Sequence, residues 1–140
     1  MSLKPTMSTV SVLDGSALKG KRGFERIFNA LRYSLDGLRD AWAYEDAFRQ
    51  EIWLAGVMVP VALLLPLGLI EKILLVAMVV LVLIVELLNT GIEAAVDRDS
   101  LEINPLGKRA KDIGSAAVML SLLLAAGTWI AILAHHFLWL

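Results

Sequence analysis

The sequence contains no cysteine, and it has little charge for its apolar content. The absence of cysteine excludes disulfide bonds, metal sites built on thiolates and cysteine nucleophiles. Charged residues make up 19% of the chain and apolar residues 58%, and the mean hydropathy is +0.71. Because a soluble domain is close to half apolar, this composition indicates an integral membrane protein.

The first part of the chain divides into a tail and an amphipathic segment. Residues 1–22 are rich in Ser and Thr and contain no apolar run as long as a signal peptide needs, so we expect a disordered tail. The remaining residues, 23–140, are long enough for one domain. Between about 24 and 50, apolar residues recur every three or four positions, which predicts an amphipathic helix lying in the membrane interface.

Three later segments are long and apolar enough to cross a bilayer. Their predicted bounds are about 52–70, 73–96 and 113–133. Glu71 and Lys72 would then form the turn between the first two spans, and Pro60 and Pro66 would kink the first span. The expected fold class is therefore all-α integral membrane, with three transmembrane helices and one interfacial helix.

The distribution of basic residues predicts the orientation. Of the 13 Lys and Arg residues, only Lys72 lies outside the N-terminal region and the 98–112 loop. Basic residues favour the cytoplasmic side of a membrane protein, so we expect a cytoplasmic N-terminus and a C-terminus on the opposite side of the membrane. The predicted partner is a membrane, and no nucleic acid is expected.

The second predicted span carries a polar stripe. Residues 73–85 are uncharged, and Glu86, Asn89, Glu93 and Asp97 follow at spacings of three, four and four. At about 100° per residue these side chains fall within an arc of about 80° on one helix face. A carboxylate inside a membrane costs about 3 to more than 10 kcal/mol, so the stripe needs an explanation.

The two ends of the stripe have different interpretations. Glu93 and Asp97 could lie near the lipid headgroups and pair with Lys or Arg. Glu86 lies about 16 Å deeper than Asp97, and its own helix places no basic residue within reach. Glu86 is therefore the first candidate for a functional residue.

Carboxylates, an amide and basic residues at headgroup depth suit phosphoryl transfer from a water-soluble donor to a lipid hydroxyl. Glu93 and Glu45 could supply hard oxygen ligands to a divalent cation on the phosphates. Glu86, about 10 Å deeper than Glu93, is at the depth of an acceptor hydroxyl and could act as its base. The cations available on the same side to stabilise the transferring charge are Arg26, Arg109 and Lys111.

Three sequence blocks resemble the prokaryotic diacylglycerol kinases, which are small integral-membrane lipid kinases. The blocks are VELLNTGIEAAVD (85–97), AFRQE (47–51) and RAKDIGSAAV (109–118). This resemblance implies a homotrimer with active sites between subunits, and phosphorylation of 1,2-diacylglycerol to phosphatidate with ATP and Mg²⁺. It also implies a bacterial inner membrane, with the C-terminus in the periplasm. The related undecaprenol kinases share the stripe, but AFRQE and the preceding DAW favour the diacylglycerol branch.

The resemblance also implies roles for individual residues. Glu86 would be the catalytic base with Asn89 beside it, and Glu45 and Glu93 would bind Mg²⁺ and reach the nucleotide phosphates. The other nucleotide contacts would be Arg26, Tyr33, Glu102, Ile103, Asn104, Lys111 and Asp112. The lipid acceptor site would contain Ala30, Leu31, Arg32, Ser34, Leu35, Arg39, Trp42, Ala47, Phe48, Arg49, Gln50, Glu51 and Ser115.

The chain departs from the enterobacterial pattern of this family at two places. Leu35 and Asp36 stand where those members commonly carry Trp-Lys, and Asn104 and Pro105 stand where they carry His and Glu. An ion- or proton-conducting assembly is the alternative from a different functional class, because it also uses intramembrane carboxylates. Such a path should continue to the far face, whereas residues 73–85 carry no polar side chain.

Overall fold

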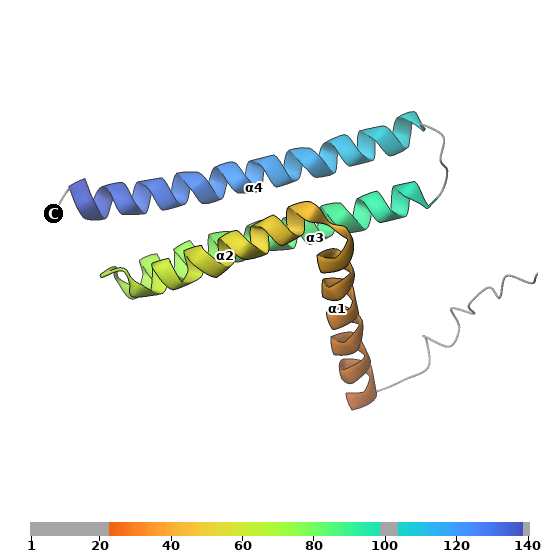
Figure 1. The fold of residues 1–140 in the computed structure, drawn as a ribbon, viewed down its shortest axis with the longest axis horizontal. Coiled ribbons are helices and arrows are strands. Elements are labelled where there is room, and N and C mark those ends of the chain that lie inside the picture. Colours follow the sequence, from red (N-terminus) through yellow and green to blue (C-terminus); the bar gives the residue numbers. More distant parts are fainter. Residues whose placement is uncertain (1–22, 99–103, 139–140) are drawn as a thin grey trace, which may run out of the picture. The chain divides into compact units, whose positions relative to one another are not determined.

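The computed structural model describes residues 23–98 and 104–138, and these residues form four helices and no strand (Figure 1). The helices are α1 (Phe24–Tyr44), α2 (Asp46–Leu64), α3 (Leu69–Asp97) and α4 (Pro105–Leu138). By length and composition, α2, α3 and α4 could each cross a membrane. The predictions of an all-helical fold and of three such helices are confirmed. The chain divides into two compact units, Met1–Asp36 and Gly37–Leu140, with the boundary inside α1.

The helix expected over about 24–50 ends earlier, at Tyr44. Glu45 has an extended backbone (φ −110°, ψ 110°), so residues 46–50 form the start of α2 instead. Arg49 stabilises this junction from α2. Its guanidinium donates hydrogen bonds to the carbonyls of Trp42 (2.8 Å) and Ala43 (3.1 Å), and it pairs with Asp46. These carbonyls lie in the last turn of α1, where no helical N–H is available to them.

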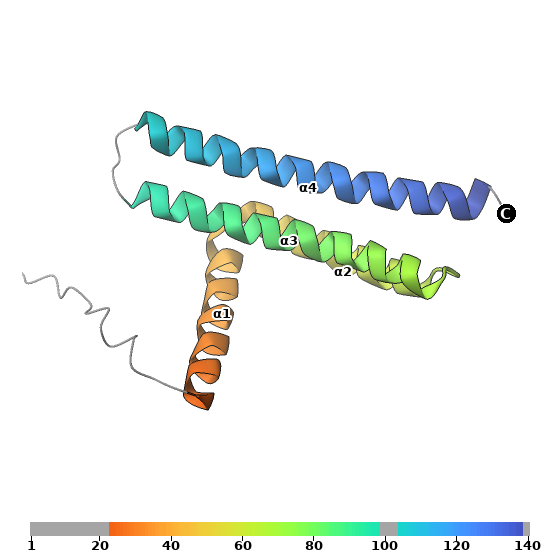
Figure 2. The same ribbon diagram turned by 180° about the vertical axis from the view of Figure 1, so that it is seen from behind.

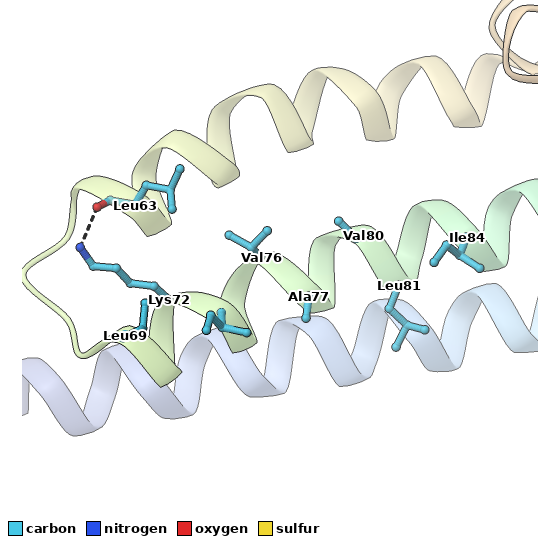
Figure 3. A pocket seen from close by; sticks show the side chains of 9 residues that line it. Leu63, Leu69, Lys72, Val76, Ala77, Val80, Leu81 and Ile84 are labelled. Carbon is cyan, nitrogen blue, oxygen red and sulfur yellow. Dashed lines mark hydrogen bonds between the residues drawn. The ribbon is translucent and has the colours of Figure 1, made fainter. Parts of the chain in front are cut away.

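The turn between α2 and α3 lies at residues 65–68, so the prediction that Glu71 and Lys72 form it is wrong. Leu65 is extended (φ −61°, ψ 145°), as the ring of the following proline requires, and Pro66 therefore follows the end of α2 rather than kinking it. Glu71 and Lys72 belong to the first turn of α3 and fasten the connection. Glu71 Oε2 accepts a hydrogen bond from the Gly68 N–H (2.8 Å), and Lys72 Nζ donates to the Leu63 carbonyl (2.7 Å; Figure 3).

Asn104 and Pro105 begin α4. The side-chain oxygen of Asn104 accepts a hydrogen bond from the Leu106 N–H (2.9 Å), and its carbonyl accepts one from the Lys108 N–H (2.9 Å). Proline suits the first helical position because its fixed φ is helical and no donor is needed there. Asn104 therefore acts as an N-cap.

The central helix of the second unit, Gly37–Leu140, is α3, which packs against both α2 and α4 (Figures 1 and 2). The apolar core lies toward its N-terminal end, where Ala62 of α2, Leu75 and Val79 of α3, and Trp129 of α4 come together. The buried indole N–H of Trp129 donates to the Leu75 carbonyl (3.2 Å). This core fixes the spacing of the three helices, and so positions their other halves.

We predict that Arg49→Gln lowers the free energy of unfolding by about 1–2 kcal/mol, because two carbonyls and one carboxylate lose a charged donor that is partly exposed. Thermal and SDS-induced unfolding in mixed micelles would measure this loss. Arg49→Lys should recover part of the stability, since Lys keeps the charge but lacks the forked donor geometry. Asp46→Asn removes only the ion pair and should cost less; an equal cost would assign the effect to the ion pair.

Candidate functional site

A pocket of about 540 Å³ lies among α2, α3 and α4. Two carboxylates from the α1–α2 junction and α2 and two from α3 share this pocket with amides, one hydroxyl and apolar side chains. The lining residues are Glu45, Ala47, Gln50, Glu51, Leu54, Glu86, Asn89, Glu93, Ser115, Val118 and Leu122.

Helical periodicity explains why these positions meet. Residues three, four or seven apart share one face of a helix. On α2 the face runs from Ala47 through Gln50 and Glu51 to Leu54, and on α4 it runs from Ser115 to Leu122. The stripe of α3 faces the space between them, and so three helix faces enclose its polar side chains.

The polar residues of α3 differ in their surroundings. Glu86 is buried, with 5% of its surface exposed. Asn89 Nδ2 donates a hydrogen bond to Glu93 Oε1 (3.2 Å), one turn further along the helix. Among the described residues, Asn89 Oδ1 and Glu51 Oε2 are buried acceptors without a hydrogen-bond partner. Unpaired buried acceptors cost free energy, which suggests that the pocket is built to receive a ligand.

The pocket has an excess of negative charge. Glu45, Glu51, Glu86 and Glu93 line it, and no described lining residue is basic. In surroundings this apolar, like charges repel strongly unless a cation or a proton intervenes. The pocket therefore favours a cationic occupant.

The donor set suits Mg²⁺ shared with a phosphate ligand. Mg²⁺ prefers oxygen donors and is commonly held by one or two carboxylates together with substrate phosphates. Glu45 and Glu93 provide two such carboxylates in one pocket. Within the described ranges, no group of three or more His, Asp or Glu side chains forms a metal site by itself. The residues present thus fit an ion whose remaining ligands come from a nucleotide.

Two ion pairs lie beyond the pocket on the next helical turns. Asp97 Oδ1 of α3 pairs with Lys111 Nζ of α4 (2.7 Å), and Lys108 pairs with Asp112 along α4 (2.6 Å). Asp97 follows Glu93 by one turn, so its ion pair ties α3 to α4 beside the carboxylates. Pairing with a basic residue was one of the two interpretations of Asp97, and the structure contains that pair.

Comparison with known proteins identifies the family. Residues 32–133 match the family model of the prokaryotic diacylglycerol kinases. A diacylglycerol kinase of Pseudomonas aeruginosa is 51% identical over 118 residues, which cover 84% of this chain and 96% of that relative. The chain belongs to the prokaryotic diacylglycerol kinase family. Diacylglycerol kinases of Escherichia coli strain K12 (48% over 115 residues) and Haemophilus influenzae (41% over 111 residues) cover 82% and 79% of this chain, each with 94% of its own length.

The predicted membership of this family is confirmed, and the structure brings together a central part of the predicted site. The pocket contains both predicted catalytic residues, both predicted metal ligands and part of the predicted lipid site. These residues are Glu86, Asn89, Glu45, Glu93, Ala47, Gln50, Glu51 and Ser115. Their individual roles remain predictions.

Several other predicted residues are placed elsewhere in the same unit. Phe48 is buried in packing, with 3% exposed, and Arg49 caps the end of α1. Asn104 caps α4, and Lys111 and Asp112 form the ion pairs described above. None of these five lines the pocket.

The remaining predicted residues either lie on α1 or fall outside the described residues. Trp42 lies near Trp53 of α2, with ring centroids 6.3 Å apart, and Arg39 is exposed on α1. Glu102 and Ile103 fall outside the described residues. The others belong to the exposed α1 segment within the first compact unit: Arg26, Ala30, Leu31, Arg32, Tyr33, Ser34 and Leu35.

Sequence reasoning missed three apolar residues of the pocket, Leu54, Val118 and Leu122. Their residue types are ordinary in a membrane-spanning helix, so composition gives no signal for them. Their spacing does, because Leu54 follows Glu51 by three residues, and Val118 and Leu122 follow Ser115 by three and seven. Extending each polar face by one or two turns would have found them.

We predict that Mg²⁺ alone raises the unfolding temperature in micelles, because a cation relieves the repulsion among the pocket carboxylates. At ten times its dissociation constant the gain should be about 1.4 kcal/mol. Differential scanning fluorimetry with MgCl₂, against NaCl at equal ionic strength, would measure it. Glu93→Gln should reduce the response, whereas Glu71→Gln, outside the pocket, should retain it. An equal response to NaCl would contradict the prediction.

Proposed function

We propose that this protein transfers the γ-phosphate of ATP to the free hydroxyl of 1,2-diacylglycerol, giving phosphatidate and ADP. The observation that carries the proposal is the buried Glu86 in one pocket with Glu45 and Glu93, in a chain of the diacylglycerol kinase family. This reaction would return diacylglycerol to phospholipid synthesis.

The pocket offers a route for the lipid chains. A smaller apolar pocket of about 150 Å³ shares Glu51, Leu54 and Leu122 with the polar pocket, and it extends among α2, α3 and α4 toward Met58 and Val79. An acyl chain in the apolar pocket would keep a glycerol hydroxyl beside the carboxylates. This arrangement supports an acceptor that is apolar at one end and carries a hydroxyl at the other.

Glu86 is the base in the proposed reaction, a role supported by its burial in the pocket beside Glu93 and Asn89. Its carboxylate accepts the proton of the acceptor hydroxyl while that oxygen forms a bond to the γ-phosphorus and the bond between this phosphorus and the leaving ADP oxygen breaks. Asn89 lies one turn away and orients Glu93 through its amide. Glu86 itself is buried, with 5% of its surface exposed, which limits the contact of its carboxylate with water.

Glu45 and Glu93 are the residues that would hold Mg²⁺. When bound there, Mg²⁺ would supply positive charge against the phosphates during phosphoryl transfer. Lys111 pairs with Asp97, one turn beyond Glu93, and could exchange this carboxylate partner for a nucleotide phosphate. The charges of ATP and Mg²⁺ together would thus match the carboxylates and the lysine.

Neither alternative function is favoured. The relatives reported above are named diacylglycerol kinase, which supports the diacylglycerol acceptor over undecaprenol. Family membership likewise supports a kinase over an ion-conducting assembly.

Assembly and orientation complete the proposal. The protein works as a homotrimer in a bacterial inner membrane, with its N-terminus and the polar end of α3 on the cytoplasmic side, where ATP is present. The number of subunits follows from the family resemblance, and an apolar groove of about 540 Å³ along α3, distinct from the polar pocket, offers a surface on which a neighbouring subunit could pack. Figure 3 shows Val76, Val80 and Ile84 along this groove, and Ile73, Val80 and Ile84 are exposed in the single chain.

We predict that purified protein in mixed micelles transfers labelled γ-phosphate from ATP to diacylglycerol, and that Glu86→Gln lowers kcat by about 10² or more, the scale of losing a general base. Glu71→Gln, on the same helix but outside the pocket, should keep near-normal turnover. Undecaprenol offered side by side tests the acceptor. Near-normal turnover in Glu86→Gln would remove Glu86 from the role of base.

We predict that single-cysteine variants report the trimer, since the natural chain has no cysteine to interfere. Val80→Cys, in the apolar groove, should form disulfide-linked dimers on mild oxidation, and amine cross-linking should end at three copies of the 15.3 kDa chain. Leu123→Cys, exposed on α4, serves as the comparison. A monomer at all micelle ratios would contradict the assembly.

A further inference from the structure

Gly114 lies on α4 directly against the side chain of Asn89. A Cβ atom at position 114 would collide with Asn89 Oδ1, and it would lie 3.3 Å from Asn89 Cγ and 3.8 Å from Ile92 Cδ1. Gly114 itself is buried. The absence of a side chain is thus what gives the Asn89 amide its place between the two helices.

The two ends of the Asn89 amide meet different surroundings. Nδ2 donates to Glu93 Oε1, whereas Oδ1 is buried, faces the position of Gly114 and has no hydrogen-bond partner among the described residues. The carboxylate of Glu93 accepts and cannot donate, so it selects the amide orientation with nitrogen toward it. The space at Gly114 then receives the oxygen.

We propose that Gly114 is a positioning residue for the cation site, acting through Asn89 on Glu93. The inference rests on the proposed function, in which Glu93 holds the metal ion. A methyl group at position 114 would push the amide away from α4 and break or bend its hydrogen bond to Glu93. The Glu93 carboxylate would then lose the donor that orients it, as happens when the outer partner of a metal ligand is removed.

A second glycine provides a matched control for packing alone. Gly107 lies two turns before Gly114 on α4, and a Cβ there would lie 2.8 Å from Val96 Cγ1 of α3. Val96 in turn lies seven residues after Asn89, so both glycines make the same kind of close approach in one antiparallel register. They differ in their neighbours, because Gly107 lies against an apolar methyl group and Gly114 lies against the pocket amide.

The test is a double-mutant cycle on Gly114→Ala and Asn89→Ala, read by metal binding. Mn²⁺ affinity is measured by electron paramagnetic resonance in the presence of a non-hydrolysable ATP analogue, beside kcat and the Mg²⁺ dependence of activity. Gly114→Ala should weaken Mn²⁺ affinity by about 10- to 100-fold, the usual range for an outer-shell partner. Once Asn89 is removed, Gly114→Ala should have no further effect, so that the double variant equals Asn89→Ala.

Gly107→Ala, and Gly127→Ala at an open position of α4, should leave Mn²⁺ affinity unchanged even where they alter the unfolding temperature. Equal weakening by Gly107→Ala, or additive effects in the cycle, would overturn the inference. Should Gly114→Ala alone fail to fold, folding of the double variant supports the contact, and failure of both overturns it. Wild type that transfers no phosphate while the Mn²⁺ cycle holds would refute the proposed function and retain Gly114 as a positioning residue.

Discussion

The burial of the carboxylate of Glu86 on an apolar helix is the constraint on which the arrangement of α2, α3 and α4 depends. Lipid cannot solvate such a group, so the polar face of α3 must be covered by protein. The covering faces are those of α2 and α4 that carry Gln50, Glu51 and Ser115. Three polar faces thus turn toward one another, and this leaves the apolar faces free for lipid or for another subunit.

Along α3, stability and chemistry occupy different halves. The N-terminal half contains the apolar core, with Leu75 and the hydrogen bond from Trp129, and the C-terminal half contains the carboxylates. With 29 residues, α3 is about 43 Å long, whereas a hydrocarbon core is about 30 Å thick. This surplus length is enough for the polar end to reach the headgroups, where the proposed function requires a water-soluble nucleotide and a lipid hydroxyl to meet.

The sequence predicted the helical spans and the polar stripe, because hydropathy and a spacing of three and four are local properties that a single helix expresses. It did not predict the helix ends. The extended backbone of Glu45 ends the expected surface helix early, and the side chain of Lys72 in α3 donates to the Leu63 carbonyl at the end of α2. These helix ends depend on which carbonyls need a donor. Arg49 and Asn104 were assigned to substrates by resemblance, and in this structure both make capping contacts with backbone groups, with an added ion pair from Arg49 to Asp46. Such roles leave little trace in residue type.

A glycine inside a helix normally lowers helix stability, by about 1 kcal/mol relative to alanine. An alanine at position 114 would stabilise the helix, but its Cβ would collide with Asn89. Helix propensity therefore favours alanine here, whereas the contact with Asn89 requires glycine. The same conflict appears in the unpaired oxygens of Asn89 and Glu51, which remain buried without donors among the described residues. Each feature costs stability, and under the proposed function a cation held by Glu93 together with nucleotide phosphates would offset that cost. The structural cost and the proposed chemistry would then have one origin, the placement of Asn89 and Glu93 for the cation of the proposed reaction.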